Sequence, residues 1–183
     1  MRFSRVVTTM GMVLASSLAA AQYPAGAKMG PIIEEYGPVM AAPPDAFAMD
    51  NERSYKIVKD VVSAAGKPGE MNRHIEAVAR LLNMQAQAGM PAENMDVAVV
   101  VHGPAIRDLL SDEAYRERFG MANPNTGLLS ALEEAGVKVY LCSQTAAGRG
   151  YSLDSISPSA TVALSAMGAH IRLQDEGYTL IPF

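Results

Sequence analysis

Residues 95–101 read MDVAVVV, a nearly continuous apolar run that is rich in β-branched side chains. A run of this kind is typical of a strand in a parallel sheet that is covered on both faces. Residues 137–141, VKVYL, have the same character, and Gly136 before them ends a helical stretch. These two stretches predict buried strands in a domain where strands and helices alternate.

The segments around these two stretches extend the alternation. In residues 72–88, apolar side chains recur every three or four positions, which predicts a helix with one buried face. Asn123 and Pro124 are the residue types expected at a helix cap and at the first helical position. The full expected series is strand 55–62, helix 72–88, strand 95–101, helix 105–119, helix 123–135, strand 137–141, loop and short helix 143–156, strand 160–164, helix 167–176 and strand 178–181.

Five strands with helices between them predict an α/β fold. Parallel strands need long crossover connections, and these connections are right-handed in nearly all proteins. We therefore expect a three-layer sandwich in which a five-stranded, mostly parallel sheet lies between helices. The chain has 183 residues, enough for one such domain, which we place at residues 54–183.

The overall composition excludes several classes of protein. The single cysteine, Cys142, cannot form a disulfide within its own chain. The formal net charge is −4 and the chain has no basic block, so we expect no binding to nucleic acid. Walker, G-x-G-x-x-G and G-x-S-x-G motifs do not occur in the sequence, so we expect no cofactor and no serine hydrolase activity.

The first 21 residues have the order of a secretory signal peptide. Arg2 and Arg5 form a basic start, an apolar stretch covers residues 6–20, and small residues precede Gln22. An uncleaved membrane anchor is the alternative, but threonine and serine interrupt a stretch that is already short for a span. We expect cleavage after Ala21 and an exported product, periplasmic or secreted, without a membrane attachment after cleavage.

Residues 22–53 are rich in proline, alanine and glycine, and five of the 11 prolines lie between residues 22 and 50. Proline lacks a backbone donor and fixes φ, so neither a helix nor a central strand is expected there. We interpret this segment as an extended tether or arm. A plain linker is the simpler interpretation. The alternative is an arm that packs on a neighbouring subunit, with anchors at Ile32, Ile33, Tyr36 and Val39.

Two polar positions follow the predicted central strands. His102, with Gly103 after it, ends the strand at 95–101, and Cys142 ends the strand at 137–141. Ligands of open α/β sheets bind outside the carboxyl ends of the strands. A thiol just before a helix N-terminus is stabilised as the thiolate, whereas a buried cysteine can equally be an inert apolar residue. The sequence leaves both interpretations of Cys142 open.

We expect no metal site. The three histidines, His74, His102 and His170, and the single cysteine are spread singly over predicted helices and strand ends. Metal ligands in proteins usually come in close pairs, and no such pair occurs among these residues. A structural role for His102 is therefore the simpler interpretation, with a contact to a ligand as the alternative.

Residues 137–158, VKVYLCSQTAAGRGYSLDSISP, resemble a segment of the DsrE/DsrF/TusD-like sulfur-relay superfamily. In that segment a cysteine closes the third strand, and a helix of small residues leads to an Arg-Gly pair, here Arg149-Gly150. The resemblance extends over residues 54–183 and includes MDVAVVVHGPA at 95–105, NPNTGLLSALEEAGVKVYLC at 123–142 and HIRLQDEGYTLI at 170–181.

The resemblance implies a flavodoxin-like (DsrEFH-like) α/β domain and homo-oligomers, trimers or hexamers. It also implies, from some members of the superfamily, a cysteine that carries sulfur as a persulfide, and Cys142 matches that cysteine. A sulfur donor or acceptor protein would then be a partner. The chain departs from the sulfur-relay members in its predicted export, because those members work in the cytoplasm, and in its proline-rich arm.

Three hypotheses follow from these observations. The first is a sulfur-handling protein with a persulfide on Cys142, and its candidate ligand-binding residues are His102, Gly103, Ser143, Gln144 and Arg149, the last to attract an anion such as thiosulfate. The second is a non-catalytic oligomeric module that binds a small molecule or a protein, with an inert Cys142. The third is a redox role in which the lone thiol forms mixed disulfides.

Overall fold

The computed structural model describes residues 23–182, so the predicted signal peptide lies outside the described residues. A five-stranded sheet forms the centre of the fold, with strand order β4-β3-β2-β1-β5 and every pair parallel. The expected α/β class is confirmed, and the sheet is wholly rather than mostly parallel. No helix within residues 23–182 is long and apolar enough to cross a bilayer.

The secondary structure follows the expected alternation. Strands and α-helices are β1 (Tyr55–Val61), α1 (Arg73–Gln87), β2 (Met95–Val101), α2 (Asp112–Phe119), α3 (Thr126–Glu134), β3 (Lys138–Cys142), α4 (Ser143–Gly148), β4 (Ala160–Ala163), α5 (Ala166–Asp175) and β5 (Thr179–Ile181). Three short 3-10 helices are η1 (Ala92–Asn94), η2 (Gly103–Leu109) and η3 (Leu153–Ser155).

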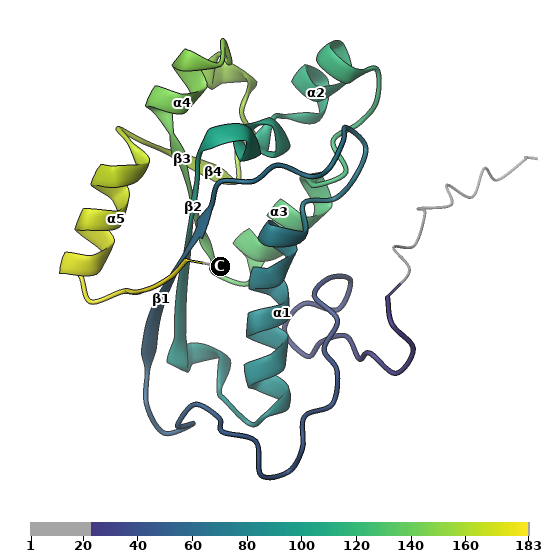
Figure 1. Cartoon of the computed structure of the whole chain (residues 1–183), viewed down its shortest axis with the longest axis vertical. Helices are drawn as coiled ribbons and strands as arrows, with labels where there is room; N and C mark the ends of the chain where they lie inside the picture. The colour runs from purple at the N-terminus through teal and green to yellow at the C-terminus, as the bar shows by residue number, and fades with distance from the viewer. Residues whose placement is uncertain (1–22, 183) are drawn as a thin grey trace, which may run out of the picture.

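Helices cover both faces of the sheet (Figure 1). From β1 to β4 each strand lies next to the one before it, and α1 and α3 lie together on one face. The connection from β4 returns to the opposite edge of the sheet and carries α5 across the other face. Right-handed crossovers require this arrangement, because reversing the direction of travel across the sheet moves the helix to the other face.

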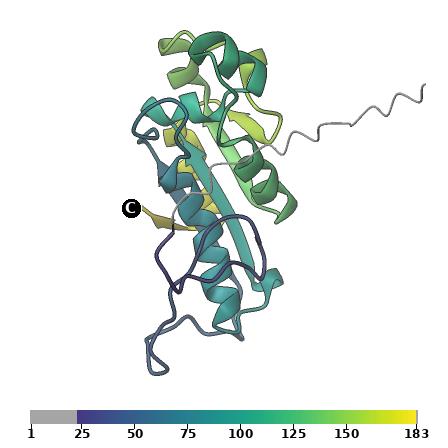
Figure 2. The same ribbon diagram turned by 90° about the vertical axis from the view of Figure 1, so that its right-hand side faces the viewer.

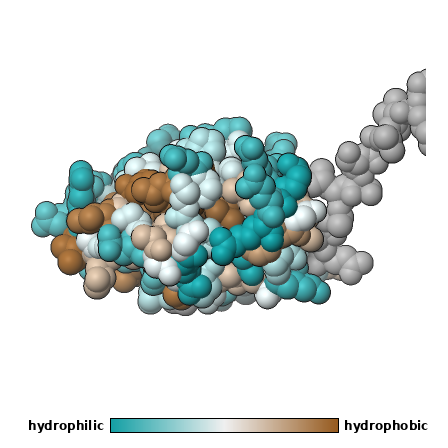
Figure 3. Space-filling view, turned by 90° about the horizontal axis from the view of Figure 1, so that it is seen from above, coloured by the Kyte–Doolittle hydropathy of each residue, from teal (hydrophilic) through white to brown (hydrophobic). Residues whose placement is uncertain are grey.

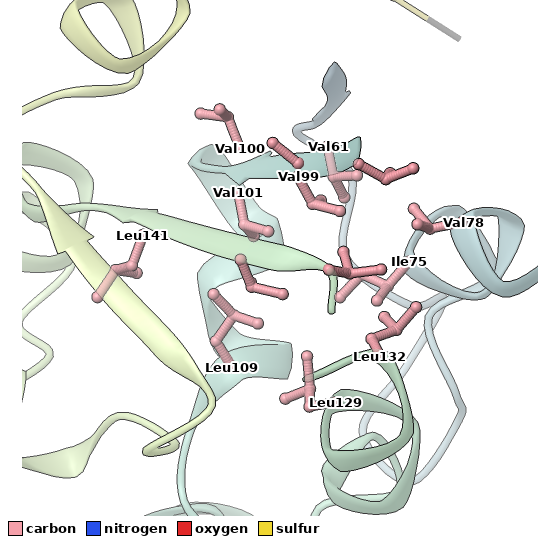
Figure 4. Packing of buried hydrophobic residues seen from close by; sticks show 14 of the residues in the cluster. Val61, Ile75, Val78, Val99, Val100, Val101, Leu109, Leu129, Leu132 and Leu141 are labelled. Carbon is pink, nitrogen blue, oxygen red and sulfur yellow. The ribbon is translucent and has the colours of Figure 1, made fainter. Parts of the chain in front are cut away.

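The main core lies between the sheet and the helices α1 and α3 (Figure 4). Val99 and Val101 of β2 and Leu141 of β3 project into it, opposite Ile75 and Val78 of α1 and Leu129 and Leu132 of α3, and these side chains are all fully or nearly fully buried. Burial of each such side chain contributes about 1.5–3 kcal/mol, so this layer holds the strands in register. The apolar run at 95–101 is buried for the reason that the sequence predicts.

Two helix boundaries between β2 and β3 differ from expectation. The single helix expected at 105–119 is two helices, η2 and α2, because Leu110 leaves the helical path to pair with Ile156. Ser111 then caps α2, its side chain accepting from the N–H of Ala114. Local spacing in the sequence cannot reveal this break, since it depends on a contact with a segment 46 residues away, Leu110 to Ile156.

The helix expected from Asn123 instead begins at Thr126. The Asn123 amide donates to the carbonyl oxygens of Asp108 and Leu110, at 3.0 and 2.7 Å, and its Oδ1 accepts from Asn125. Asn123 therefore joins two loops as a buried bridge and does not cap the helix. Buried polar groups are retained when they are hydrogen-bonded in this way.

The arm is not a free tether over residues 23–39, because it packs on α1 of the same chain (Figures 1 and 2). Ile33 and Val39 are both buried, and Ile33 belongs to the hydrophobic core that includes Ile75, Val78 and Leu82 of the chain's own helix α1. The Asn83 Oδ1 atom accepts from the N–H groups of Ile32 and Ile33, and its Nδ2 atom donates to the carbonyls of Ile33, Tyr36 and Gly37. A proline-rich chain cannot satisfy its backbone by itself, so the helix supplies the partners.

A buried carboxylate anchors the start of the arm. Glu76 of α1 is fully buried, and its Oε1 accepts from the hydroxyl of Tyr23 at 2.5 Å and from the N–H of Gly37 at 3.3 Å. The guanidinium of Arg73 donates to the other oxygen at 2.6 Å. Burial raises the pKa of Glu76, but these three donors outweigh burial, and the net pKa lies below its ordinary value.

Candidate functional site

Cys142 is the last residue of β3, at a point where the connections that follow two neighbouring strands, β3 and β4, diverge. The segment after β3 forms α4 and packs against η2, whereas the segment after β4 forms α5 on the other face. Ligands of open α/β sheets bind at such switch points, because the diverging connections leave a crevice at the strand ends. The strand-end position of Cys142 is as expected, and its helix follows without an intervening residue.

Four hydrogen-bond donors near the sulfur of Cys142 lower its pKa by favouring the ionised form. The donors are the side chain and backbone of Thr145, the N–H of Gln144 and the N–H of Ala166. The first three belong to the start of α4 and the last to the start of α5, so two helix N-termini converge on one thiol. Burial raises the pKa of Cys142, but the hydrogen bonds outweigh it, and the net pKa lies below its ordinary value.

A hydrogen bond between side chain and backbone holds the two turns together. The hydroxyl of Ser143 donates to the carbonyl oxygen of Leu164 at 2.9 Å, which joins the β3–α4 turn to the β4–α5 turn. Ser165 caps α5, its side chain accepting from the N–H of Gly168. The geometry around the sulfur is thus fixed from both helices, and Ser143 and Gln144 lie beside it as the sequence suggests.

Three ionisable side chains meet near the carboxyl ends of β2 and β1, the next two strands of the sheet after β3. His102 Nε2 lies 3.0 Å from Asp60 Oδ1, and His170 Nε2 lies 2.8 Å from the same oxygen. Asp60 belongs to β1, His102 directly follows β2, and His170 belongs to α5. A carboxylate only accepts hydrogen bonds, so both imidazoles donate through Nε2. The His170 Nδ1 atom is buried and has no hydrogen-bond partner among the described residues.

The other two candidate residues lie differently. Gly103 has a φ of +57°, and a Cβ there would lie 2.8 Å from the Val62 side chain, so its glycine serves backbone packing. Arg149 is exposed and lies at the far end of α4 from Cys142. The structure therefore brings Ser143 and Gln144 to the thiol and does not place the guanidinium of Arg149 at the same end of the helix.

Sequence reasoning missed four contributors to this edge of the sheet. Thr145 is the second residue after Ser143 and could have been found as a hydroxyl in the first turn of the helix after the cysteine. Asp60 and His170 are 110 residues apart, and only the fold brings them together. The N–H of Ala166 has no signal in the sequence, because any residue type can supply a backbone donor.

A metal centre finds no support in the described part of the chain, where no group of three or more histidine, cysteine, aspartate or glutamate side chains is arranged to hold an ion. A groove of about 1010 Å³ opens elsewhere, between the arm and the loop from β1 to α1. Tyr23, Tyr36, Glu70 and Arg73 are among its lining residues, and none of the predicted site residues lines it. The thiol and this groove are separate features.

Comparison with known proteins gives one family. The model of the DsrE/DsrF-like family matches residues 56–183, which is most of the chain and all of the sheet except Tyr55. None of the curated proteins matches the chain significantly in sequence.

Two solved structures are similar in fold. One is a protein of unknown function, MTH1491 from Methanobacterium thermoautotrophicum, with 22% identity and a TM-score of 0.51 over 71% of this chain and 100% of its own. The other is the ychN protein from E. coli, with 18% identity and a TM-score of 0.49 over 70% of this chain and 99% of its own. At this level of identity the first supports the fold alone.

Proposed function

The chain belongs to the DsrE/DsrF-like family, and on that premise we propose that it handles sulfur through a persulfide on Cys142. The family is generally linked to sulfur relay. The observation that carries the proposal is the position of the sulfur, which accepts donors from the first turns of both α4 and α5. A cysteine kept only for packing needs no such set of donors.

The proposed reaction is a transfer of sulfane sulfur. The thiolate of Cys142 attacks the outer sulfur of a persulfide donor, the bond between the two donor sulfurs breaks, and the donor leaves as a thiolate. Cys142 then carries the persulfide, and attack by an acceptor thiolate on its outer sulfur returns Cys142 to the thiolate. Each step conserves the negative charge. The N–H donors and the helix dipoles would stabilise that charge throughout the cycle.

Access to the sulfur would come from the outer edge of the sheet. Cys142 is 5% exposed, so a donor or acceptor must reach it at the joined turns of β3–α4 and β4–α5. Leu164, next to the Ser143 contact, is 81% exposed. An incoming sulfur group would thus pass exposed apolar side chains, here called the apolar rim (Leu164, Met167 and Ile171), before it reaches the thiol.

This rim continues along α5, and we propose that a second copy of this chain packs there. Met167 and Ile171 lie one helical turn apart and are 76% and 70% exposed. Brown apolar atoms gather at the left of Figure 3, the side on which α5 lies in Figure 1. Exposed apolar side chains in this number beside one edge strand favour association, and the family resemblance favours a trimer or hexamer.

Light scattering on a sizing column tests this association. A Met167→Ser, Ile171→Ser variant should elute as a monomer where the parent elutes as a trimer or hexamer. The control is Met84→Ser on α1, because this methionine is 41% exposed but does not belong to the apolar rim on α5. A parent that is monomeric at every concentration would contradict the proposed interface.

Export is a separate part of the proposal, supported by the pattern of residues 1–21. The test is the N-terminal sequence of the protein recovered from outside the cytoplasm of a producing cell. The expected first residue is Gln22. A chain that stays in the cytoplasm with its first residues intact would contradict export without affecting the sulfur chemistry.

Intact mass spectrometry tests the sulfur proposal. The chain from Gln22 onward is reduced, incubated with polysulfide and compared with Cys142→Ser and with the parent in denaturant. The expected result is a gain of one sulfur atom by the folded parent alone. If the folded parent gains none and resists alkylation until it unfolds, Cys142 is inert, and the binding-module hypothesis replaces the carrier.

A further inference from the structure

Helix α5 is attached to the sheet by few buried side chains. Of its ten residues, Ala166 and Leu173 are buried, whereas α1 buries six of its fifteen. Met167 and Ile171 are 76% and 70% exposed, so the outward face adds nothing to the attachment. Most of the stability of a helix in a protein comes from packing of one face. A single further contact with the sheet therefore has a larger effect on the position of α5 than it would have on α1.

His170 makes such a contact from the middle of α5. Its Nε2 lies 2.8 Å from Asp60 Oδ1, and 15% of its side chain is exposed. Asp60 belongs to β1, which pairs with β2 on one side and β5 on the other and is thus fixed in the sheet. The Nδ1 atom of His170 is buried without a hydrogen-bond partner among the described residues. Unpaired buried polar atoms are uncommon, so the bond of Nε2 accounts for a histidine at this position.

The first turn of the same helix supplies a donor to Cys142. The N–H of Ala166 is one of the four donors near the sulfur. Ala166 and His170 are four residues apart in one helix, which is about one turn and roughly 6 Å along the axis. Asp60 on β1 and Cys142 on β3 lie on opposite sides of β2, and α5 contacts both β2 and β3. The helix therefore links two strand ends that β2 separates.

Two fixed points define the direction of α5. The hydroxyl of Ser143 donates to the carbonyl oxygen of Leu164 at 2.9 Å and fixes the turn before the helix. A helix held at this turn alone can tilt about it, and a tilt moves the N–H of Ala166 relative to the sulfur. His170 holds the helix one turn further on and so opposes the tilt. A hydrogen bond weakens steeply as its angle closes, so a small tilt is sufficient to weaken this donor.

We propose that His170 is a positioning residue for the Cys142 thiolate, because its bond to Asp60 holds α5 where the N–H of Ala166 meets the sulfur. The imidazole acts through the helix and takes no proton from the thiol. The inference deepens the proposed function and rests on it for what the thiolate does. The position of α5 can be tested without any sulfur donor.

The test is the ultraviolet absorbance of the thiolate as a function of pH. Cys142 is the single cysteine, so subtracting the titration of the same protein with Cys142→Ser removes the absorbance of the tyrosines. No reagent has to reach the sulfur, which matters because Cys142 is 5% exposed.

The central variant is His170→Phe, which keeps a ring of similar size and removes the donor. Asp60 still accepts from His102 in this variant, so its carboxylate keeps a donor. The ratio of thiolate to thiol at neutral pH should fall by about threefold to tenfold, where tenfold corresponds to complete loss of one hydrogen bond. His170→Gln should restore most of the ratio, because its amide keeps an N–H donor. The matched control is Gln174→Leu, exposed one turn further along α5, which should leave the ratio unchanged.

A double-mutant cycle separates positioning from a general loss of stability. Asp60→Ala removes the acceptor of the His170 bond and should lower the ratio as His170→Phe does. Adding His170→Phe to Asp60→Ala should lower the ratio no further, because the bond that the two residues share is already absent. Far-ultraviolet circular dichroism checks the folding of each variant, and His170→Leu replaces His170→Phe if the phenylalanine variant does not fold.

The outcomes are distinct. A His170→Phe titration that coincides with the parent overturns the inference, and so does an equal shift in Gln174→Leu or an additive shift in the double variant. Sulfur loading by mass spectrometry tests the proposed function separately. A titration that shifts without sulfur loading would keep the positioning role and reject the carrier, whereas loading without a shift would keep the carrier and reject the positioning role.

Discussion

Replacing Asn83 with alanine should detach the arm from α1. Asn83 has no exposed surface, and its side chain makes five hydrogen bonds to the arm at 2.8–3.2 Å. Its NH2 group has two hydrogens for three carbonyls, so about four bonds count at full strength. At about 1 kcal/mol net for each, the upper limit is about 4 kcal/mol.

Rehydration of the arm reduces this value. Once the arm leaves α1, water satisfies the carbonyls and N–H groups that Asn83 held, so we expect a loss of about 2–3 kcal/mol in the free energy of unfolding. Urea unfolding followed by circular dichroism measures this loss, and the rate of tryptic cleavage at Lys28 reports whether the arm has detached.

Gln87→Ala is the graded control for this prediction. Gln87 Nε2 donates to the carbonyl of Gly30 at 2.7 Å from a partly exposed position, so its loss should cost less than about 1 kcal/mol. An Asn83→Ala variant within about 0.5 kcal/mol of the parent, with Lys28 cut no faster, would refute the view that this amide holds the arm.

Three further predictions concern the thiol and the arm. Thr145→Val should lower the thiolate-to-thiol ratio of Cys142 about tenfold, because it removes one donor to the sulfur, and absorbance titration measures this ratio. The pKa of Glu76 is depressed in the folded chain, so its ionised form stabilises the fold at pH values above its ordinary pKa of 4.5. The difference in free energy of unfolding between the parent and Glu76→Gln should therefore become smaller as the pH falls below that value. Urea unfolding at several pH values measures this difference. Gly37→Ala should lower the free energy of unfolding by more than about 1 kcal/mol, because φ is +72° and a Cβ would overlap the backbone of α1. Gly26→Ala should lower it less, because Gly26 has open space around it and only its positive φ of +87° opposes an alanine. Equal losses at the two glycines would contradict close packing of the arm.

The strands and the long helix could be predicted because their signals are local. Residues 95–101 are apolar throughout, and the predicted strand coincides with β2. The apolar spacing of 72–88 gives α1 within one residue at each end, and Asn72 caps it by accepting from His74 and Ile75. In each case the residues that decide the structure lie within the element itself.

The arm and the histidine cluster could not be predicted, because their partners lie far away in the sequence. Proline content correctly excluded helix and strand from residues 23–39, but the amide that holds them is Asn83, on a helix that shows no sign of this role. His102 and His170 were noted as single histidines, and Asp60 joins them only because β1 and β2 are neighbours and α5 crosses above. Contacts of this range follow from topology and not from local pattern.

The strand-end cysteine lies between these two cases. Its place after a buried strand and before a helix was visible in the sequence, but this place left a stabilised thiolate and an inert buried cysteine equally open. The second helix N-terminus, at Ala166, comes from the order β3-β4 in the sheet. Whether the thiol is exposed to the solvent could not be known beforehand, and at 5% exposure it is a nearly buried group.

A sulfur carrier must both accept and release sulfur on Cys142 in the folded protein. The most direct measurement is transfer from the loaded chain to a small thiol acceptor, followed by intact mass spectrometry over time and compared with the same loaded chain in denaturant. We expect the folded protein to return to its unmodified mass faster than the denatured chain and then to be loaded again. Sulfur that stays on the folded chain, or that leaves the folded and the denatured chain at the same rate, would rule out a carrier role for Cys142.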